Sequence, residues 1–105
     1  MKRFLISYKF RPETGSVDRW HQRVAEFIAA LDSDPALKGR IVYRCMKARD
    51  GNDYYHLAET ADDQAAKELQ QRDFFNRYTE ETKRVAGGDV TVTPLETIAE
   101  TARPR

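Results

Sequence analysis

His56 is the residue with the widest chemical range in this sequence, because an imidazole ring titrates near neutral pH. It lies within an aromatic and apolar segment, residues 54–59. There it could take a proton from a substrate or orient a phenolate. The alternative is a core or interface histidine that is hydrogen-bonded to a neighbour such as Tyr8 or Ser7. We predict His56 as the catalytic residue and keep this structural alternative beside it.

Aromatic residues gather around the same segment and are candidates for substrate binding. Tyrosine hydroxyls in an apolar wall suit hydrogen bonds to the oxygens of a quinone or phenol. The predicted substrate-binding residues are Tyr8, Tyr43, Tyr54, Tyr55 and Trp20. The alternative is packing, because tyrosine favours half-buried strands and dimer contacts. Trp20 also fits the apolar stripe of a predicted helix.

The residue inventory argues against metal and thiol chemistry. Cys45 is the only cysteine, which excludes an internal disulfide framework and a cysteine-rich zinc site. The only histidines are His21 and His56. The sequence has no phosphate-binding loop, nucleotide fingerprint or nucleophile elbow. We predict no metal and no cofactor.

Alternating apolar residues predict the strands that must carry these side chains. The Asp50-Gly51 pair predicts a hairpin turn between the second and third strands, because such turns need positive φ. Pro94 interrupts the last strand and indicates an edge position or a bulge. The predicted strands cover residues 3–10, 40–49, 54–59 and 90–93.

Apolar residues at three- and four-residue spacing predict two helical regions. The first begins after Ser16, a good N-cap, and ends before Pro35. The second begins near Asp62, has a possible kink at residues 72–73 and stops at residues 87–88, which are both glycine.

The resulting order, βαββαβ, predicts a ferredoxin-like α+β fold. Right-handed crossovers place the first and third strands in the centre of a four-stranded antiparallel sheet, with both helices on one face. We divide the chain into one domain, residues 1–96, and a C-terminal tail, residues 97–105.

Composition limits the partners of this domain. The chain has 105 residues, a formal net charge of +1 and 40% hydrophobic residues. The hydrophobic content argues against a disordered chain. The nearly balanced charge argues against duplex nucleic acid or an anionic membrane as a partner. The N-terminus does not read as a secretory signal, and no window is apolar enough to span a membrane. We predict a cytoplasmic location.

The sheet has more apolar surface than two helices can cover. Residues 3–10 are apolar on both faces, and the middle strands carry large side chains on both faces. The uncovered face would include part of the Ser7/Tyr8 and Tyr54/Tyr55 pairs, and Tyr43. Such a patch marks an interface or a ligand surface. We predict a homodimer that forms through this face.

Two stretches resemble the dimeric α+β barrel superfamily, and within it the antibiotic-biosynthesis-monooxygenase-like proteins. The first, residues 55–66, is an apolar strand, a polar bend and a helix that opens with small residues. The second, residues 69–78, is similar to the family's second-helix segment, where a polar pair precedes a buried phenylalanine. In element order the resemblance covers nearly the whole chain.

The resemblance implies a homodimer with a small apolar pocket between sheet and helices in each subunit. It implies a monooxygenase or an isomerase without cofactor that acts on a hydrophobic, phenol-like compound. In the monooxygenase, the substrate itself would react with oxygen as a carbanion or phenolate. His56 would be the base, and the tyrosines would orient the substrate oxygens. Haem degradation is not implied, because Thr60 and Thr79 stand near the positions of that branch's tryptophan and histidine.

Two other functions stay open at this point. One is a non-catalytic ligand-binding or structural dimer. The other is an RNA-recognition domain, which has the same strand order and aromatic residues on its central strands. Residues 53–57 lack the glycines and the basic start of that domain's motif, and the net charge is balanced. We therefore predict a small hydrophobic ligand and no nucleic acid.

Overall fold

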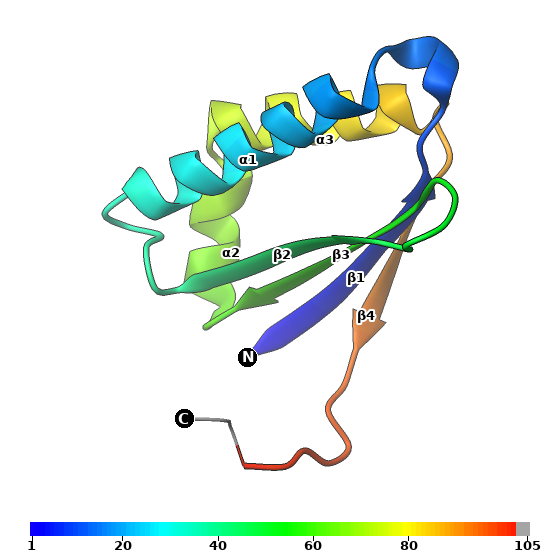
Figure 1. Ribbon diagram of the computed structural model, residues 1–105. Coiled ribbons are helices and arrows are strands. Elements are labelled where there is room, and N and C mark those ends of the chain that lie inside the picture. The colour runs from blue at the N-terminus through cyan, green and yellow to red at the C-terminus, as the bar shows by residue number, and fades with distance from the viewer. Residues whose placement is uncertain (103–105) are drawn as a thin grey trace.

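The alternating and helical patterns fold into a four-stranded sheet with helices on one face (Figure 1). The computed structural model describes residues 1–102. Its strands are β1 (Lys2–Lys9), β2 (Ile41–Lys47), β3 (Asp53–Thr60) and β4 (Val90–Leu95). Its helices are the short 3₁₀ turn η1 (Pro12–Thr14), α1 (Val17–Ser33), α2 (Asp63–Gln70) and α3 (Asp73–Val85). This is the predicted ferredoxin-like arrangement.

The strand order β2-β3-β1-β4 places β1 and β3 in the centre, as predicted. Every neighbouring pair is antiparallel. The register sets His56 of β3 opposite Ile6 of β1 and Cys45 of β2. His56 therefore lies in the middle of the sheet, with a strand on each side.

Helix α1 positions the aromatic residues that cover the sheet. It begins at Ser16, whose hydroxyl accepts a hydrogen bond from the backbone N–H of Arg19 at 3.0 Å. Its buried side chains are Trp20, Phe27 and Leu31, which share one side of the helix. The Ser16 N-cap thus predicted the start of this helix, and the apolar spacing predicted its buried side.

The predicted kink in the second helical region is a break between α2 and α3. Arg72 has extended backbone, with φ −83° and ψ 128°. Its Nε donates to a carboxylate oxygen of Asp34 at 2.7 Å, which ties the break to the end of α1. This hydrogen bond holds the pKa of Asp34 below its ordinary value. Helix α3 ends before Gly87 and Gly88, whose φ values of 66° and 87° favour glycine.

Strand β4 runs through Pro94 to Leu95, two residues beyond the predicted end. It is an edge strand, where one side of the backbone needs no partner, so proline is tolerated. Residues 96–102 are exposed and have no regular secondary structure. Residues 103–105 of the predicted tail lie outside the described residues. Across residues 1–102, no helix has the length and apolar character needed to cross a membrane.

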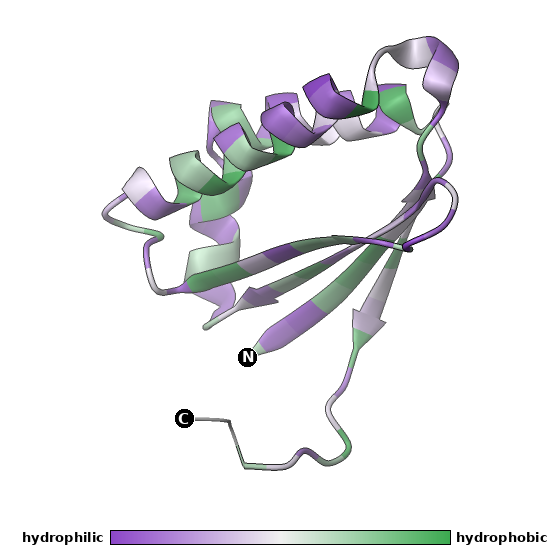
Figure 2. Cartoon of the chain, in the orientation of Figure 1, coloured by the Kyte–Doolittle hydropathy of each residue, from purple (hydrophilic) through white to green (hydrophobic). Residues whose placement is uncertain are grey.

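The two faces of the sheet carry different side chains. Tyr8 and Tyr54, one member of each predicted pair, are buried beneath the helices. Tyr43 packs against the same core, so the expectation that it lies on the uncovered face is wrong. Because successive side chains of a strand point to opposite faces, Tyr55 lies on the other face and is 40% exposed. Hydrophobic stretches run along the strands in Figure 2, whereas α1 alternates between hydrophilic and hydrophobic segments. The large exposed apolar residues on the uncovered face are Val42, Met46, Tyr55 and Leu95.

We expect Ser16→Ala to lower the free energy of unfolding by about 1 kcal/mol, because the N–H of Arg19 loses its capping acceptor. Urea denaturation followed by circular dichroism measures the change. Ser16→Asp is the matched control, since aspartate is an equally good N-cap and should retain most of the stability. Equal destabilisation by both substitutions would contradict a capping role.

Candidate functional site

His56 is completely buried on the helix-covered face of β3 and is surrounded by three tyrosine hydroxyls. Its Nε2 lies 2.8 Å from the hydroxyl of Tyr8. Its Nδ1 lies 2.9 Å from the hydroxyl of Tyr43 and 3.2 Å from that of Tyr78. The two flanking strands and α3 each contribute one of these groups. The sheet register and the helix stripe together therefore build this cluster.

The surrounding donors determine which ring nitrogen of His56 carries the proton. Trp20 Nε1–H donates to the Tyr8 oxygen at 3.0 Å. Among the described residues, the Tyr8 hydrogen then has one acceptor, Nε2 of His56. Nε2 is therefore unprotonated, and Nδ1–H donates toward the oxygens of Tyr43 and Tyr78. Because those oxygens accept from His56, their own hydrogens turn to other acceptors; for Tyr78 these are Cys45 Sγ at 3.8 Å and the hydroxyl of Tyr43.

Burial shifts every titratable group of the cluster toward its neutral form. Desolvation lowers the pKa of His56 to about 4. It raises the pKa of Cys45 to about 11 and raises the pKa of Tyr8, Tyr43 and Tyr78 further above the ordinary tyrosine value. All five groups are uncharged at neutral pH. A nucleophilic role for Cys45 is therefore disfavoured, since its thiolate form is disfavoured.

Tyr78 is the residue of this cluster that the sequence analysis missed. It lies three residues after Phe75 and four before Thr82, which places it in the apolar stripe of the second helical region. Its ring stacks on Phe27 at a centroid distance of 3.8 Å, and the guanidinium carbon of Arg23 lies 5.7 Å from its centroid. Its hydroxyl is 3.8 Å from Cys45 Sγ. One signal could have identified it, because the hydroxyl of a buried tyrosine requires a partner.

The predicted substrate-binding residues separate into three groups. Tyr8, Tyr43 and Trp20 join His56 in one hydrogen-bonded network. Tyr54 stacks on Tyr8 at 5.3 Å, but its hydroxyl bonds to Nε2 of His21 at 2.7 Å, outside the network. Tyr55 lies on the opposite face of the sheet. The folded structure thus brings three of the five predicted substrate-binding residues together around His56.

An apolar cavity of about 410 Å³ lies between the sheet and helices α2 and α3. Phe4, Ile6 and Phe75 are among its apolar wall residues. Tyr43 and Tyr78 also line it, so the two hydroxyl-bearing residues that contact His56 Nδ1 also border the cavity. His56 itself is not a wall residue. The imidazole ring is therefore connected to the cavity by its hydrogen bonds to these tyrosines.

The exposure of the wall residues distinguishes the interior of the cavity from its mouth. Tyr78, Thr60 and Thr82 are buried. Gln70 and Lys83 are exposed, and they mark the side that opens to solvent. The Thr60 hydroxyl is the one buried side-chain polar atom in residues 1–102 without a hydrogen-bond partner. Such a group costs about 1–3 kcal/mol, and a polar ligand atom that reached it would recover part of this.

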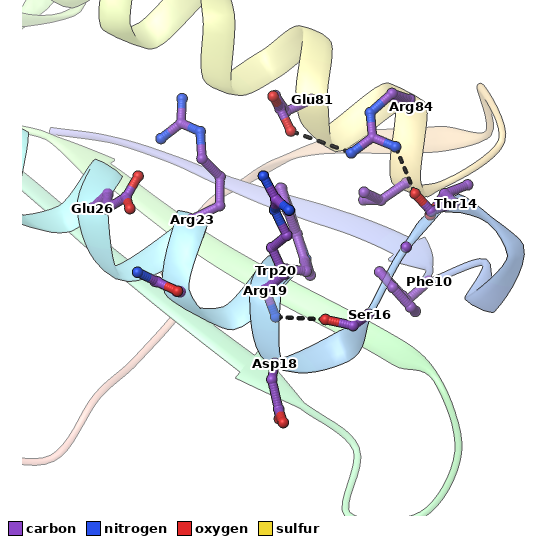
Figure 3. A pocket seen from close by; sticks show the side chains of 13 residues that line it. Phe10, Thr14, Ser16, Asp18, Arg19, Trp20, Arg23, Glu26, Glu81 and Arg84 are labelled. Atoms are coloured by element: carbon purple, nitrogen blue, oxygen red, sulfur yellow. Dashed lines mark hydrogen bonds and ion pairs between the residues drawn. The ribbon is translucent and has the colours of Figure 1, made fainter.

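A second, larger hollow of about 810 Å³ lies between α1 and α3 (Figure 3). Its lining includes three arginines and three carboxylates, and Arg84 bonds to Glu81 and to the backbone oxygen of Thr14. The balanced charges are those of a solvated groove. Trp20 forms part of its floor, whereas the His56 cluster does not line it. We take the apolar cavity as the candidate site.

The buried imidazole makes stability depend on pH. The pKa of His56 is about 4 in the folded protein and about 6.5 in the unfolded chain, so only the unfolded state binds a proton between these values. The stabilisation is present above pH 6.5 and is lost as pH falls toward 4. We expect the free energy of unfolding to decrease by about 3 kcal/mol across this window.

Chemical denaturation at several pH values measures how the free energy of unfolding depends on pH, and ¹⁵N NMR of the His56 ring identifies the tautomer directly. The same pH dependence should be observed in His21→Asn, which removes the other histidine. A protonated Nε2 at pH 7, or a His56 that titrates near 6.5, would contradict this description of the site.

Comparison with known proteins identifies the fold. No protein-family model matches the sequence, and no curated protein matches it. Solved structures do match. SnoaB of Streptomyces nogalater, a cofactor-independent oxygenase, is similar with a TM-score of 0.75 at 13% identity, over 97% of each chain.

Two further structures give the same result. An antibiotic biosynthesis monooxygenase matches with a TM-score of 0.74 at 15% identity, over 94% of this chain and 100% of its own. Rv0793 of Mycobacterium tuberculosis matches with a TM-score of 0.74 at 14% identity, over 96% of this chain and 98% of its own. The chain therefore has the ferredoxin-like fold of the antibiotic biosynthesis monooxygenases.

Proposed function

We propose that the protein is a homodimeric monooxygenase that needs no cofactor and acts on apolar, phenol-like compounds. The observation that carries this proposal is the pair of tyrosines, Tyr43 and Tyr78, in the wall of an otherwise apolar cavity. Both hydroxyl oxygens face the N–H of His56. The fold shared with SnoaB, a cofactor-independent oxygenase, supports the same reaction class.

The tyrosine hydroxyls can stabilise a substrate anion. Since their oxygens accept from His56, Tyr43 and Tyr78 can donate their hydrogens to a substrate oxygen in the cavity, which would replace acceptors such as Cys45 Sγ. Hydrogen bonds to a phenolate or enolate are stronger than those to the neutral form, so they lower the pKa of the substrate. The electron-rich anion then reacts with molecular oxygen. In this proposal His56 acts as a positioning residue.

The sequence-based prediction of His56 as the base stays a prediction and requires the other tautomer. With the proton on Nε2, Nδ1 could accept a proton that passes through Tyr78. The Tyr8 hydrogen would then lose its acceptor, which costs about one hydrogen bond. The low pKa of His56 also makes it a weak base at neutral pH.

A non-catalytic ligand-binding dimer is the second candidate. One observation favours it: none of the described cavity-wall residues is aspartate, glutamate or histidine. A substrate proton must then leave through a tyrosine or to water. Binding without oxygen consumption is the behaviour expected of this second candidate.

We expect the wild-type protein to accelerate oxygen uptake by a hydroxylated anthrone, and Tyr78→Phe to lower kcat by about 10²-fold. Removing the hydroxyl takes away a donor to the substrate anion and leaves the ring stack on Phe27 in place. An oxygen electrode measures the rate. Tyr54→Phe is the matched control, because that hydroxyl bonds to His21 outside the cavity.

Tight binding of the anthrone with no oxygen uptake above the uncatalysed rate would overturn the monooxygenase proposal and favour the ligand-binding one. An equal loss of rate in Tyr78→Phe and Tyr54→Phe would show that the Tyr78 hydroxyl does not specifically stabilise the substrate anion.

The dimer proposal is supported by the uncovered sheet face. Leu57 lies on the central strand β3 opposite Leu5 of β1 and Arg44 of β2. Val42, Met46 and other apolar side chains around them are exposed in a single chain. An uncovered sheet face that exposes several large apolar side chains is typical of an interface.

We expect the wild-type protein to sediment with twice the mass of one chain, and Leu57→Asp to sediment with the mass of one chain. The introduced carboxylate would be desolvated in the centre of the interface. Ala29→Asp, on the exposed side of α1, is the matched control and should remain dimeric. A wild-type protein that stays monomeric at micromolar concentration would contradict the dimer.

A further inference from the structure

The mouth of the apolar cavity carries one charged side chain, Lys83. The described wall residues include no acidic group and no other lysine or arginine. Lys83 is exposed, as expected for a group at the opening. An ammonium group beside an apolar chamber favours an anionic partner, because the adjacent apolar wall lowers the local dielectric.

Lys83 has no ion-pair partner among residues 1–102, whereas its neighbour Arg84 has one. Arg84 bonds to Glu81 on the outer side of α3, within the charged groove of Figure 3. The ion pairs of the described residues involve other cations and leave Lys83 without a carboxylate within 4.0 Å. Its ammonium group is therefore available to a ligand.

Tyr78 and Lys83 mark two different ends of the cavity. Tyr78 is 1% exposed and Lys83 is exposed, so the hydroxyl lies inside and the ammonium at the opening. Both residues are on α3, five positions apart, so they leave the helix in directions about 140° apart. A ligand that meets both groups must therefore carry two polar groups at separate ends of its apolar body.

We propose that the site takes aromatic hydroxy acids: the phenol end binds at Tyr43 and Tyr78, and the carboxylate binds at Lys83. This inference rests on the proposed function, since it names the substrate class of the same cavity. Lys83 selects acidic ligands over neutral ones of the same shape. It takes no part in the reaction with oxygen.

A matched pair of ligands tests this selectivity by isothermal titration calorimetry. The probes are 6-hydroxy-2-naphthoate and 2-naphthol, which share the rings and the hydroxyl and differ by the carboxylate. We expect the naphthoate to bind more tightly, with an advantage that shrinks as NaCl rises from about 0.05 M to about 0.5 M.

We expect Lys83→Met to weaken naphthoate binding about fivefold and to leave 2-naphthol binding unchanged. Lys67→Met is the matched control: Lys67 is an exposed lysine on α2 that does not line the cavity, so both affinities should remain. Tyr78→Phe should weaken both ligands, because it removes the inner contact that they share.

The outcomes separate this inference from the proposed function. If 2-naphthol binds in a Tyr78-dependent way and Lys83→Met leaves the naphthoate unaffected, selection by Lys83 is overturned and the phenol site stands. Equal weakening by Lys67→Met also overturns it, because the effect is then one of net charge. If neither probe binds, the cavity does not take phenols and both proposals fail.

Discussion

The burial of one neutral imidazole in the centre of the sheet constrains the rest of this structure. A ring with two polar nitrogens is costly in a core unless both are hydrogen-bonded. Strands β1 and β2 and helix α3 supply the partners of His56, and Trp20 on α1 fixes the direction of the chain of donors. These contacts join elements that are far apart in sequence, so the cluster specifies how the helices sit on the sheet.

The same network explains why the cavity has polar points in an apolar wall. His56 Nδ1–H donates toward Tyr43 and Tyr78, so each hydroxyl acts toward its other neighbours as a donor, and a ligand oxygen could take that place. Burial keeps the pKa of both tyrosines high, so they stay neutral donors at physiological pH. A neutral donor pair suits the recognition of a phenolate oxygen, and the exposed Lys83 adds a charge where solvent can reach it.

The sheet separates two tasks by the alternation of its side chains. Even-numbered residues of β1 and β3, such as Tyr8 and His56, face the helices and build the site. Odd-numbered neighbours such as Tyr55 and Leu57 face away and form the apolar surface proposed as the dimer interface. A shift of register by one residue would exchange the two sets, so the pairing of Ile6 with His56 is as important to the site as any side chain.

Local patterns in the sequence determined the elements, their order and the central position of β1 and β3. Alternation, helical spacing and turn residues act over a few neighbours, which is why the predicted strands and the break near Arg72 agree with the structure. The choice between two faces for Tyr55, and the inclusion of Tyr78, depended on contacts between β3, β1 and α3. Those contacts form only when the chain is folded, so hydrogen-bond partners, desolvation and the cavity at Lys83 were decided by tertiary structure alone.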